Sequence, residues 1–243
     1  MKILFCLLGL SLALSAQAKK EEVKNYSFIS SSIDELDLSN ENGRVKVETH
    51  SSDSFDIKIT NRSKTNDCTI KVEDGTTELS VDVDSKGLGN EDCDVDIEVK
   101  VPERKISYDI EVANGVINVS GVEGDVETSL ANGSADINGK AIYDFESKSA
   151  NGTVVAKGLV GDASVKAANG MIQLNFKEVA KKAKINVKTA NGDAKVFVPK
   201  ASKFKTKFIS MSGDLVNEIG DDPESEAKIK MFSANGSLTI SPY

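Results

Sequence analysis

The sequence contains no tryptophan, one histidine (His50) and three arginines (Arg44, Arg62 and Arg104) among 243 residues. Proteins that bind nucleic acids usually present a basic face with aromatic side chains on which bases can stack. Here the formal net charge is −8 at pH 7, and aromatic residues make up 5% of the chain. The composition therefore argues against nucleic-acid binding.

The sequence also lacks an apolar run of about 20 residues, which a membrane-spanning helix requires. A shorter, largely apolar stretch runs from Ile3 to Leu14, after Lys2 and before Ser15-Ala16-Gln17-Ala18. A basic start, an apolar stretch and small residues before a cleavage point are typical of a secretory signal peptide, and fit a buried N-terminal helix less well. We expect residues 1–18 to be removed and residues 19–243 to be exported to the periplasm or the cell surface.

Cysteine is scarce, because Cys6 lies in the expected signal peptide and only Cys68 and Cys93 remain in the mature chain. Paired cysteines in an oxidising compartment usually form disulfides. We therefore expect Cys68 and Cys93 to be joined, the alternative being two buried, reduced thiols. Because histidine is nearly absent and no Cys-x-x-Cys spacing occurs, we expect no metal site and no cofactor.

One acidic stretch leaves the question of calcium open. Asp82-x-Asp84-x-x-Gly87 resembles the start of an EF-hand calcium loop. However, Lys86 stands where an oxygen ligand belongs, and Cys93 stands where the bidentate acid belongs. Solvated strand faces followed by a glycine-rich turn explain the same residues, and we favour that interpretation.

The mature chain is rich in alternating apolar and polar residues. Examples are Val45–Thr49, Phe55–Ile59 and Val95–Val99. Period-two alternation bounded by Gly, Asn, Asp and Ser indicates half-buried β-strands. The composition and the pattern together predict an all-β protein.

The triplet Ala-Asn-Gly recurs through the second half of the sequence. Its Asn-Gly pairs are Asn114-Gly115, Asn132-Gly133, Asn151-Gly152, Asn169-Gly170, Asn191-Gly192 and Asn235-Gly236, and a degenerate copy, Ser212-Gly213, precedes the last of them. A self-similar period of about twenty residues is the signature of a stacked repeat architecture. We expect coils of about 18–23 residues.

Two architectures could produce this repeat. Asn-Gly is the strongest short hairpin signal, so a meander of hairpins is one candidate. The other is a β-solenoid, a single-stranded and right-handed β-helix in which equivalent positions stack about 4.8 Å apart. We favour the solenoid because each coil encloses its own core, and because Gly121–Gly124 and Gly158–Gly161 supply a second corner. Glycine would then allow the tight corner, and the asparagines could stack as an amide ladder.

The repeat predicts a single β-repeat domain over residues 19–243. Residues 102–243 carry the regular Asn-Gly repeats. Residues 25–101 are less regular and richer in acids, so we expect them to form atypical first coils or a capping sheet.

No catalytic motif accompanies the repeat. Acids such as Asp125 and Asp162 share a column, which structural repetition alone would produce, and no Gly-x-Ser-x-Gly elbow or Cys/His pair occurs. Polysaccharide cleavage needs paired carboxylates or a metal with a basic residue. We therefore expect no catalytic residues and no enzyme activity.

Several stretches match a known bacterial family. They are Asn42–Val47, Val99–Pro102, the serial Asn-Gly rungs and Val196–Lys200. The chain resembles a family of unknown function with β-strand repeats, provisionally named as adhesins, and is similar to the head-domain adhesins that share its repeat style. The resemblance covers roughly Ile33 to Ile240 and implies an envelope location, without any catalytic or ligand residues.

Three functions fit these observations. The first is an exported binding scaffold that engages an unknown surface protein or glycan. The second is a structural envelope protein without a specific ligand, and the third is a carbohydrate-active enzyme of the β-helix kind. We favour the first.

Overall fold

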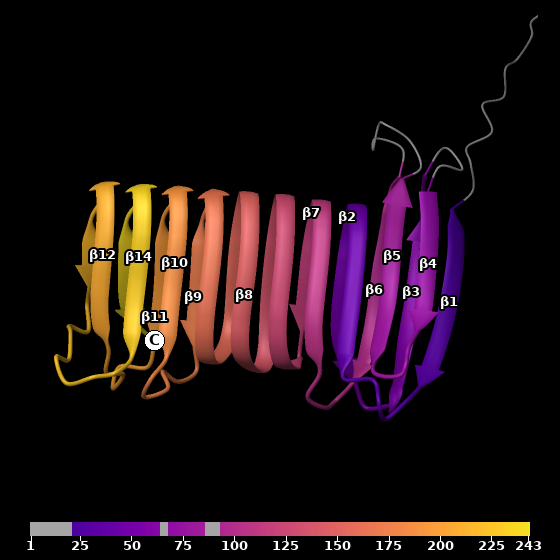
Figure 1. Ribbon diagram of the computed structural model, residues 1–243, viewed down its shortest axis with the longest axis horizontal. Coiled ribbons are helices and arrows are strands. Elements are labelled where there is room, and N and C mark those ends of the chain that lie inside the picture. The colour runs from indigo at the N-terminus through magenta and orange to yellow at the C-terminus, as the bar shows by residue number, and fades with distance from the viewer. Residues whose placement is uncertain (1–20, 64–67, 86–92) are drawn as a thin grey trace, which may run out of the picture.

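The computed structural model describes residues 21–63, 68–85 and 93–243, and Figure 1 shows them as a rod of strands that run across its long axis. Every regular element in these residues is a β-strand. Over the same residues, no helix is long and apolar enough to span a membrane. The expected signal peptide, residues 1–18, lies outside the described part of the chain.

All of the strands belong to one hydrogen-bonded sheet that winds along the rod. They are β1 (Glu22–Ile29), β2 (Glu35–His50), β3 (Ser54–Asn61), β4 (Cys68–Asp74), β5 (Glu78–Ser85), β6 (Val95–Pro102), β7 (Ser107–Ser120), β8 (Glu123–Asn169), β9 (Ile172–Phe176), β10 (Lys184–Asn191), β11 (Ala194–Val198), β12 (Lys205–Ser212), β13 (Leu215–Asn217), β14 (Lys228–Asn235) and β15 (Leu238–Pro242). The winding is continuous enough that β8 passes through more than two coils without a break.

Each coil consists of two extended legs that meet at an Asn-Gly corner. In β7 the first leg precedes Asn114 and the second leg follows Gly115. Successive coils pair in parallel and in register, so that Asn114 lies beside Asn132. Consecutive strands of a hairpin meander would pair antiparallel. The parallel register therefore confirms the solenoid.

One hydrophobic core lies between the two legs of every coil. In β7, Ile110 and Val112 of the first leg and Ile117 and Val119 of the second leg are buried. Tyr108 of the first leg is also buried, and its equivalents in later coils are Val126, Phe145, Ala163 and Ile185; the equivalents of Val119 on second legs are Ile137, Ala156, Leu174 and Val196. Because side chains alternate along a strand, the residues between them point outward. Each coil thus has an outer face on either side of the core.

The N-terminal end of the rod is closed by flat strands. The first leg of β2 pairs in parallel with β5, and its second leg pairs in parallel with β6. Beyond them, β4 pairs antiparallel with β5, β3 with β6 and β1 with β3, at the indigo and magenta end of Figure 1. Residues 51–106 therefore form an insertion between two coils. The regular stack includes residues 35–50, which the sequence pattern had assigned to the irregular third.

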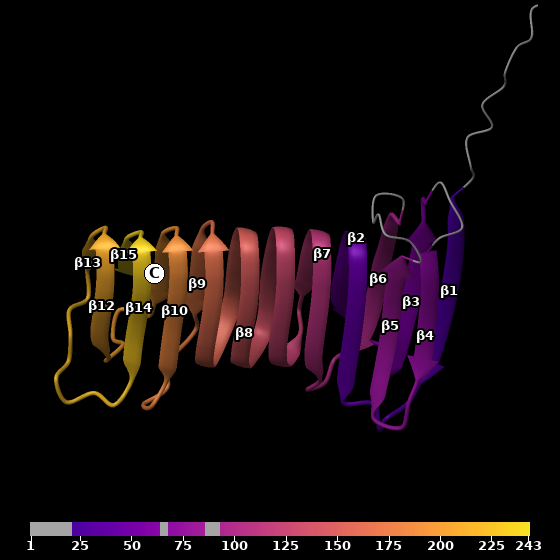
Figure 2. The same ribbon diagram turned by 45° about the horizontal axis from the view of Figure 1, so that its top comes forward.

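The coils at the C-terminal end do not stack in chain order. The repeat spacing would place the coil of Ser212 between those of Asn191 and Asn235. Instead, β14 lies between β10 and β12, and β15 lies between β11 and β13 (Figures 1 and 2). In this arrangement Met231 and Leu238 of the inserted coil are completely buried, whereas Leu215 in the outermost coil is 42% exposed.

Glycine is required at the corner because the backbones of successive coils come very close there. A Cβ atom on Gly133 would lie 1.8 Å from the carbonyl oxygen of Gly115, and one on Gly152 would lie 2.0 Å from that of Gly133. Gly133 also has a φ of +134°, which residues with a side chain rarely adopt. Any larger residue would both strain the corner and push two coils apart.

A matched pair of glycine substitutions separates these two effects. Gly220 has a φ of +90°, but a Cβ atom there would meet nothing within 4 Å. Gly220→Ala should therefore cost only backbone strain, about 1–2 kcal/mol. Gly133→Ala should cost about 3 kcal/mol or more, because strain and overpacking act together. Denaturant unfolding of both variants measures the difference, and equal losses would contradict the steric argument.

Candidate functional site

The corner asparagines form a continuous amide ladder along one edge of the rod. The Nδ2 group of each asparagine donates to Oδ1 of the asparagine in the neighbouring coil. The pairs are Asn132 to Asn114 (2.8 Å), Asn151 to Asn132 (3.0 Å), Asn169 to Asn151 (2.8 Å), Asn191 to Asn169 (3.0 Å) and Asn235 to Asn191 (2.8 Å). The ladder is therefore primarily a structural element, because each amide binds its neighbours.

The ladder extends one coil further than the sequence repeat indicated. Asn114 Nδ2 donates to Asn42 Oδ1 at 3.0 Å, across 72 residues of sequence. Asn42 Nδ2 in turn donates to the carbonyl oxygen of Cys93 at 3.0 Å. Asn42-Gly43 lacks the preceding alanine and stands far from the other copies in the sequence. The Asn-Gly pair itself was the signal that could have placed it in the ladder.

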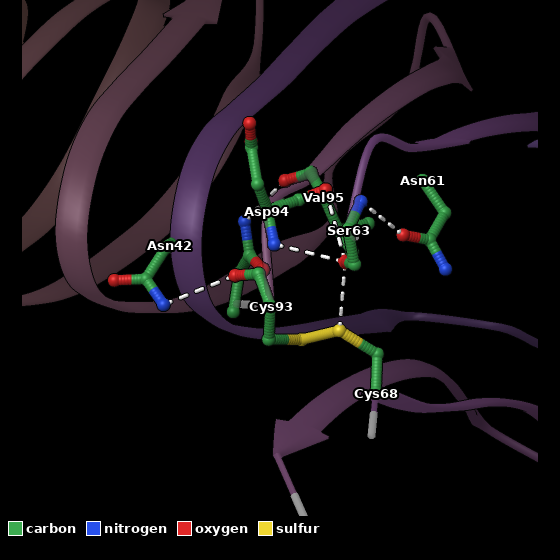
Figure 3. The surroundings of a disulfide bond; sticks show 8 residues. Asn42, Asn61, Ser63, Cys68, Cys93, Asp94 and Val95 are labelled. Carbon is green, nitrogen blue, oxygen red and sulfur yellow. Dashed lines mark hydrogen bonds between the residues drawn. A yellow bond between two sulfur atoms is a disulfide. The ribbon is translucent and has the colours of Figure 1, made fainter. Parts of the chain in front are cut away.

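A disulfide joins Cys68 and Cys93 where the ladder ends (Figure 3). The two Cα atoms lie 5.4 Å apart, and Ser63 Oγ lies 2.9 Å from Cys68 Sγ. Ser63 Oγ also accepts a hydrogen bond from the N–H of Asp94 at 3.0 Å. The disulfide and Ser63 thus connect β4, the end of β3 and the start of β6.

An ion-pair cluster stabilises the same end of the rod. The guanidinium of Arg62 donates to carboxylate oxygens of Asp94 and Asp96 at distances from 2.8 to 3.3 Å. Arg44 adds a backbone hydrogen bond to Asp96 at 2.9 Å. Burial would raise the pKa of Asp96, but these hydrogen bonds and positive charges hold it below its usual value. All three arginines of the chain lie in this part of the molecule, and Arg104 donates to the carbonyl oxygens of Ser30, Ser31 and Ile33.

A shallow groove of about 700 Å³ runs along the rod beside the ladder. We call it the corner groove. Its floor contains the small residues before each asparagine, namely Ala113, Ala131, Ala150, Ala168 and Ala190, and its far side carries Glu111, Ser129, Lys148, Lys166 and Lys188. Lys148 pairs with Glu127 at 2.8 Å, whereas Lys166 and Lys188 form no ion pair within the described part of the chain. The corner groove can therefore accept an extended chain with negative charge.

A second hollow, of about 470 Å³, lies over β1, β2, β3 and β6. Its charged side chains largely pair with one another. Lys58 and Glu98 lie 3.0 Å apart, and Lys46 and Glu48 lie 2.6 Å apart. Because most of its charged side chains already pair with one another, this hollow offers less to a ligand than the corner groove.

The outward side chains of the first legs have opposite charges at the two ends of the rod. We call this surface the first-leg face. Toward the N-terminal end it carries Glu35, Asp37, Asp109, Glu111, Asp125, Glu127, Asp144 and Glu146, and toward the C-terminal end it carries Lys184, Lys188, Lys205, Lys207, Lys228 and Lys230. Lys148, Asp162 and Lys166 lie between the two halves.

Like charges are crowded in the acidic half. Burial and the carboxylates of Asp109, Glu78, Asp82 and Glu35 raise the pKa of Asp37 to about 6. Burial also raises the pKa of Asp109, with further contributions from Glu127 and Glu111. The pKa of Asp144 is raised by burial and then by Asp162, Glu146 and Asp125. These carboxylates repel one another because equivalent residues stack from coil to coil.

The other acids considered in the sequence analysis have structural positions. Asp125 and Asp162 lie in one column of the first-leg face, and Asp162 Oδ1 accepts the N–H of Lys184 at 2.9 Å. Asp82 and Asp84 lie on β5, while Lys86 and Gly87 of the EF-hand-like stretch fall outside the described residues. Among the residues that the structure describes, no group of three His, Cys, Asp or Glu side chains is placed to hold a metal ion.

The family model described as Toastrack DUF4097 matches residues 30–241. The chain belongs to the Toastrack family. The match spans both the flat N-terminal strands and the Asn-Gly coils. This match confirms the resemblance, inferred from the sequence, to a family of unknown function with β-strand repeats.

Solved structures similar to this Toastrack protein are distant in sequence. A protein of Bacteroides fragilis, provisionally described as an adhesin, is 12% identical with a TM-score of 0.47, over 91% of this chain and 97% of that one. One of Clostridium sporogenes, provisionally described as a cell adhesion protein, is 15% identical with a TM-score of 0.41, over 92% and 100%. One of Parabacteroides distasonis, provisionally described as lipid binding, is 16% identical with a TM-score of 0.39, over 91% and 96%. No curated protein matches the chain.

The disulfide predicts a measurable loss of stability when it is removed. The cysteines are 25 residues apart, so the chain-entropy model assigns the bond about 3–4 kcal/mol. Cys68→Ser/Cys93→Ser should lower the free energy of unfolding by that amount, and reduction of the wild-type protein should have the same effect. Mass spectrometry of the unreduced protein is the direct check. Two thiols that react with an alkylating agent in the native protein would contradict the bond.

The crowded acids predict a specific pH dependence. The pKa of Asp37 is higher in the folded protein than its usual value of 3.8, so the native state binds this proton more tightly. Stability is then lost as the pH rises through about 6. Asp37→Asn should make the protein more stable at pH 7 and weaken its gain in stability on acidification to pH 5.

A carboxylate with the opposite shift serves as the control. The Ser27 hydroxyl, which donates to Asp56 at 2.6 Å, lowers the pKa of Asp56. Asp56→Asn should therefore reduce stability at pH 7. Unfolding curves at pH 5, 6 and 7 compare the two variants, and a loss of stability in Asp37→Asn at pH 7 would contradict the repulsion argument.

Proposed function

We propose that this Toastrack protein is an exported, non-catalytic binding scaffold of the cell envelope, comparable to an adhesin. Its ligand is an extended anionic chain that lies in the corner groove. The observation that carries this proposal is the groove itself, which crosses the coils from Ala113 to Ala190. With coils about 4.8 Å apart, its length is roughly 20 Å. A linear chain with a short repeat would meet the same column of residues in each coil.

The chemistry of the groove supports a negatively charged ligand. Lys166 and Lys188 are exposed and form no ion pair with the described residues, so their charge is available to a ligand. The alanine floor leaves the backbone accessible between two rows of longer side chains. Small residues beside the two unpaired lysines, Lys166 and Lys188, suit a chain that lies flat, such as an acidic polysaccharide or an acidic polypeptide segment.

Two features support export to the periplasm or the cell surface. The disulfide between Cys68 and Cys93 is a bond that persists in oxidising compartments. The first residues of the sequence have the order of a secretory signal, with cleavage expected after Ala18. The mature protein then begins at Lys19.

The layout of the outer faces supports binding without catalysis. An active site needs several groups that converge on one reacting atom. On the first-leg face the acids instead stand in columns along the rod. The residue at one such position is Ser107 in one coil and Asp125, Asp144 or Lys184 in others, so no fixed set of groups recurs. This arrangement suits a surface that contacts a large partner.

Retention on envelope fragments tests the proposal. The mature protein should bind saturably to cell-envelope fragments, and Ala150→Tyr should weaken this binding at least about tenfold because the ring fills the exposed groove floor. Asn138→Tyr introduces the same ring at an exposed second-leg position and should bind like wild type. Treatment of the fragments with protease or with periodate distinguishes a polypeptide ligand from a glycan.

Other outcomes decide between the remaining functions. Equal binding of both variants would exclude the corner groove as the site. Release of reducing or unsaturated sugar ends, abolished by Asp125→Asn or Asp162→Asn, would make the protein an enzyme. No retention and no product would favour a structural envelope protein.

A further inference from the structure

The first-leg face has a charge pattern that its own molecule does not neutralise. In the acidic half, Glu127 is the one carboxylate of the face with an ion-pair partner among the described residues, namely Lys148. Within the same described residues, the lysines of the basic half, Lys184 to Lys230, form no ion pair at all. Both halves lie on the outward side of the first legs, and both remain available to a partner.

We propose that two copies of the protein pair through their first-leg faces, with the order of the coils in one copy reversed relative to the other. A single anionic surface, such as a membrane, would attract the lysines but repel the acids of the same face. A second copy offers both signs of charge at the same spacing. Closed pairs with two-fold symmetry are also the commonest form of homo-oligomer.

The symmetry operation follows from the repeat. The two-fold axis lies in the contact plane, parallel to the strands, between the coils of Asn151 and Asn169. This rotation reverses the order of the coils but keeps each column of residues opposite the same column of the partner. The outermost coil of Ser212 then faces the coil of Asn42, and the coil of Asn235 faces the coil of Asn114.

Opposite charges meet toward both ends of the columns that this symmetry superposes, whereas at the axis Asp144 faces Asp162 and Lys148 faces Lys166. The register places Lys205, Lys228 and Lys184 in one column and Lys207 and Lys230 in the next. In the first column, Lys205 of one copy meets Glu35 of the other, and Lys184 meets Asp125. In the second column, Lys207 meets Asp37 and Lys230 meets Asp109. These pairings follow from the register of the coils within one copy, which places Glu35 beside Ser107 and Asp37 beside Asp109.

The basic half also carries apolar side chains that the contact would cover. Ile209 is 49% exposed and Met211 is 89% exposed, next to the lysines of the outermost coil. Phe232 lies beside Ile209 in the neighbouring coil, with the Lys207 Nζ atom 5.7 Å from its ring centre. Removal of these side chains from water would add a hydrophobic contribution to the charge pairing.

The face is large enough for a stable pair. Seven steps of about 4.8 Å separate the coil of Asn42 from the coil of Ser212, and a leg of seven residues is about 23 Å long. The face therefore covers roughly 750 Å² in each copy. A standard protein interface buries about 800 Å² per partner.

Charge reversal tests the pairing. Sedimentation velocity of the mature protein at low ionic strength should show a dimer that dissociates at high salt. Asp109→Lys/Asp125→Lys should raise the dissociation constant at least about 100-fold, and Lys184→Glu/Lys230→Glu should do the same. A mixture of the two variants should form a heterodimer, because each reversed pair then meets its complement. This recovery also shows that both variants are folded.

A matched variant controls for net charge. Lys157→Glu/Lys195→Glu makes the same change in charge at exposed second-leg positions and should leave the dimer intact. The proposal would be overturned if the wild-type protein were a monomer at micromolar concentration and low salt. It would also be overturned if the substitutions on the first-leg face left the dissociation constant of the dimer unchanged. So would binding of the monomer to anionic vesicles that requires Lys184 and Lys230. The corner groove lies along the same face, because Lys148, Lys166 and Lys188 also line it, so pairing of two copies covers the groove. Retention on envelope fragments is therefore measured with Asp109→Lys/Asp125→Lys, which stays monomeric and keeps these lysines, in the presence and absence of Ala150→Tyr.

Discussion

The architecture depends on the close approach of backbones at the Asn-Gly corner. The carbonyl oxygen of one corner glycine occupies the space in which the next glycine would carry a Cβ atom. This contact fixes the coils in register at the corner, and the register then aligns every other column of the coil. The amide ladder, the stacked core and the rows of outward side chains all follow from that alignment. A solenoid of this kind has little freedom to slip, because a shift of one residue would place a side chain in the corner and reverse the two faces.

Register has an electrostatic consequence as well as a steric one. A residue type that is repeated in one column is placed about 4.8 Å from its own copies. Apolar columns gain from this, because Ile, Val and Leu stack into a continuous core. Charged columns are destabilised by repulsion between like charges. The raised pKa of Asp37 reflects this repulsion, although burial makes the larger contribution to the shift and the neighbouring carboxylates the smaller one. The molecule therefore carries an unfavourable charge distribution on the first-leg face that a local exchange of Asp and Lys would remove. The persistence of two segregated halves, rather than alternating signs, is best explained by a partner that meets them.

The repeat made the central part of the fold predictable from sequence. The triplets located the corners, and the alternation around them assigned Ile117 and Val119 to the core and Asn118 to the outside. The repeat period did not identify the coil of Asn42, because residues 51–106 separate it from the next coil. A regular spacing does not reveal an insertion of that size. The position of the last coil was not predicted either. Asn235 follows Ser212 in the sequence, but its coil lies between those of Asn191 and Ser212 in the stack. That order depends on which strands pair at the assembled end, and the spacing of the triplets does not contain this information. The corner groove depends on the width between the alanine and lysine columns, which a one-dimensional pattern does not contain.

The two ends of the rod solve the problem of an open core by different means. At the N-terminal end, antiparallel strands extend both faces, and the disulfide with the Arg62 cluster binds their edges together. At the C-terminal end, β12 pairs only with β14, and β13 pairs only with β15, among the described strands. The outermost coil therefore has no neighbour until residues 228–242 are in place. Residues 205–217 therefore pair only with a segment that follows them in the chain. The final residues form the coil that connects them to the rest of the stack. The C-terminal coil is thus an internal part of the solenoid, and its loss would remove the support of the outermost coil together with its own contribution to the core.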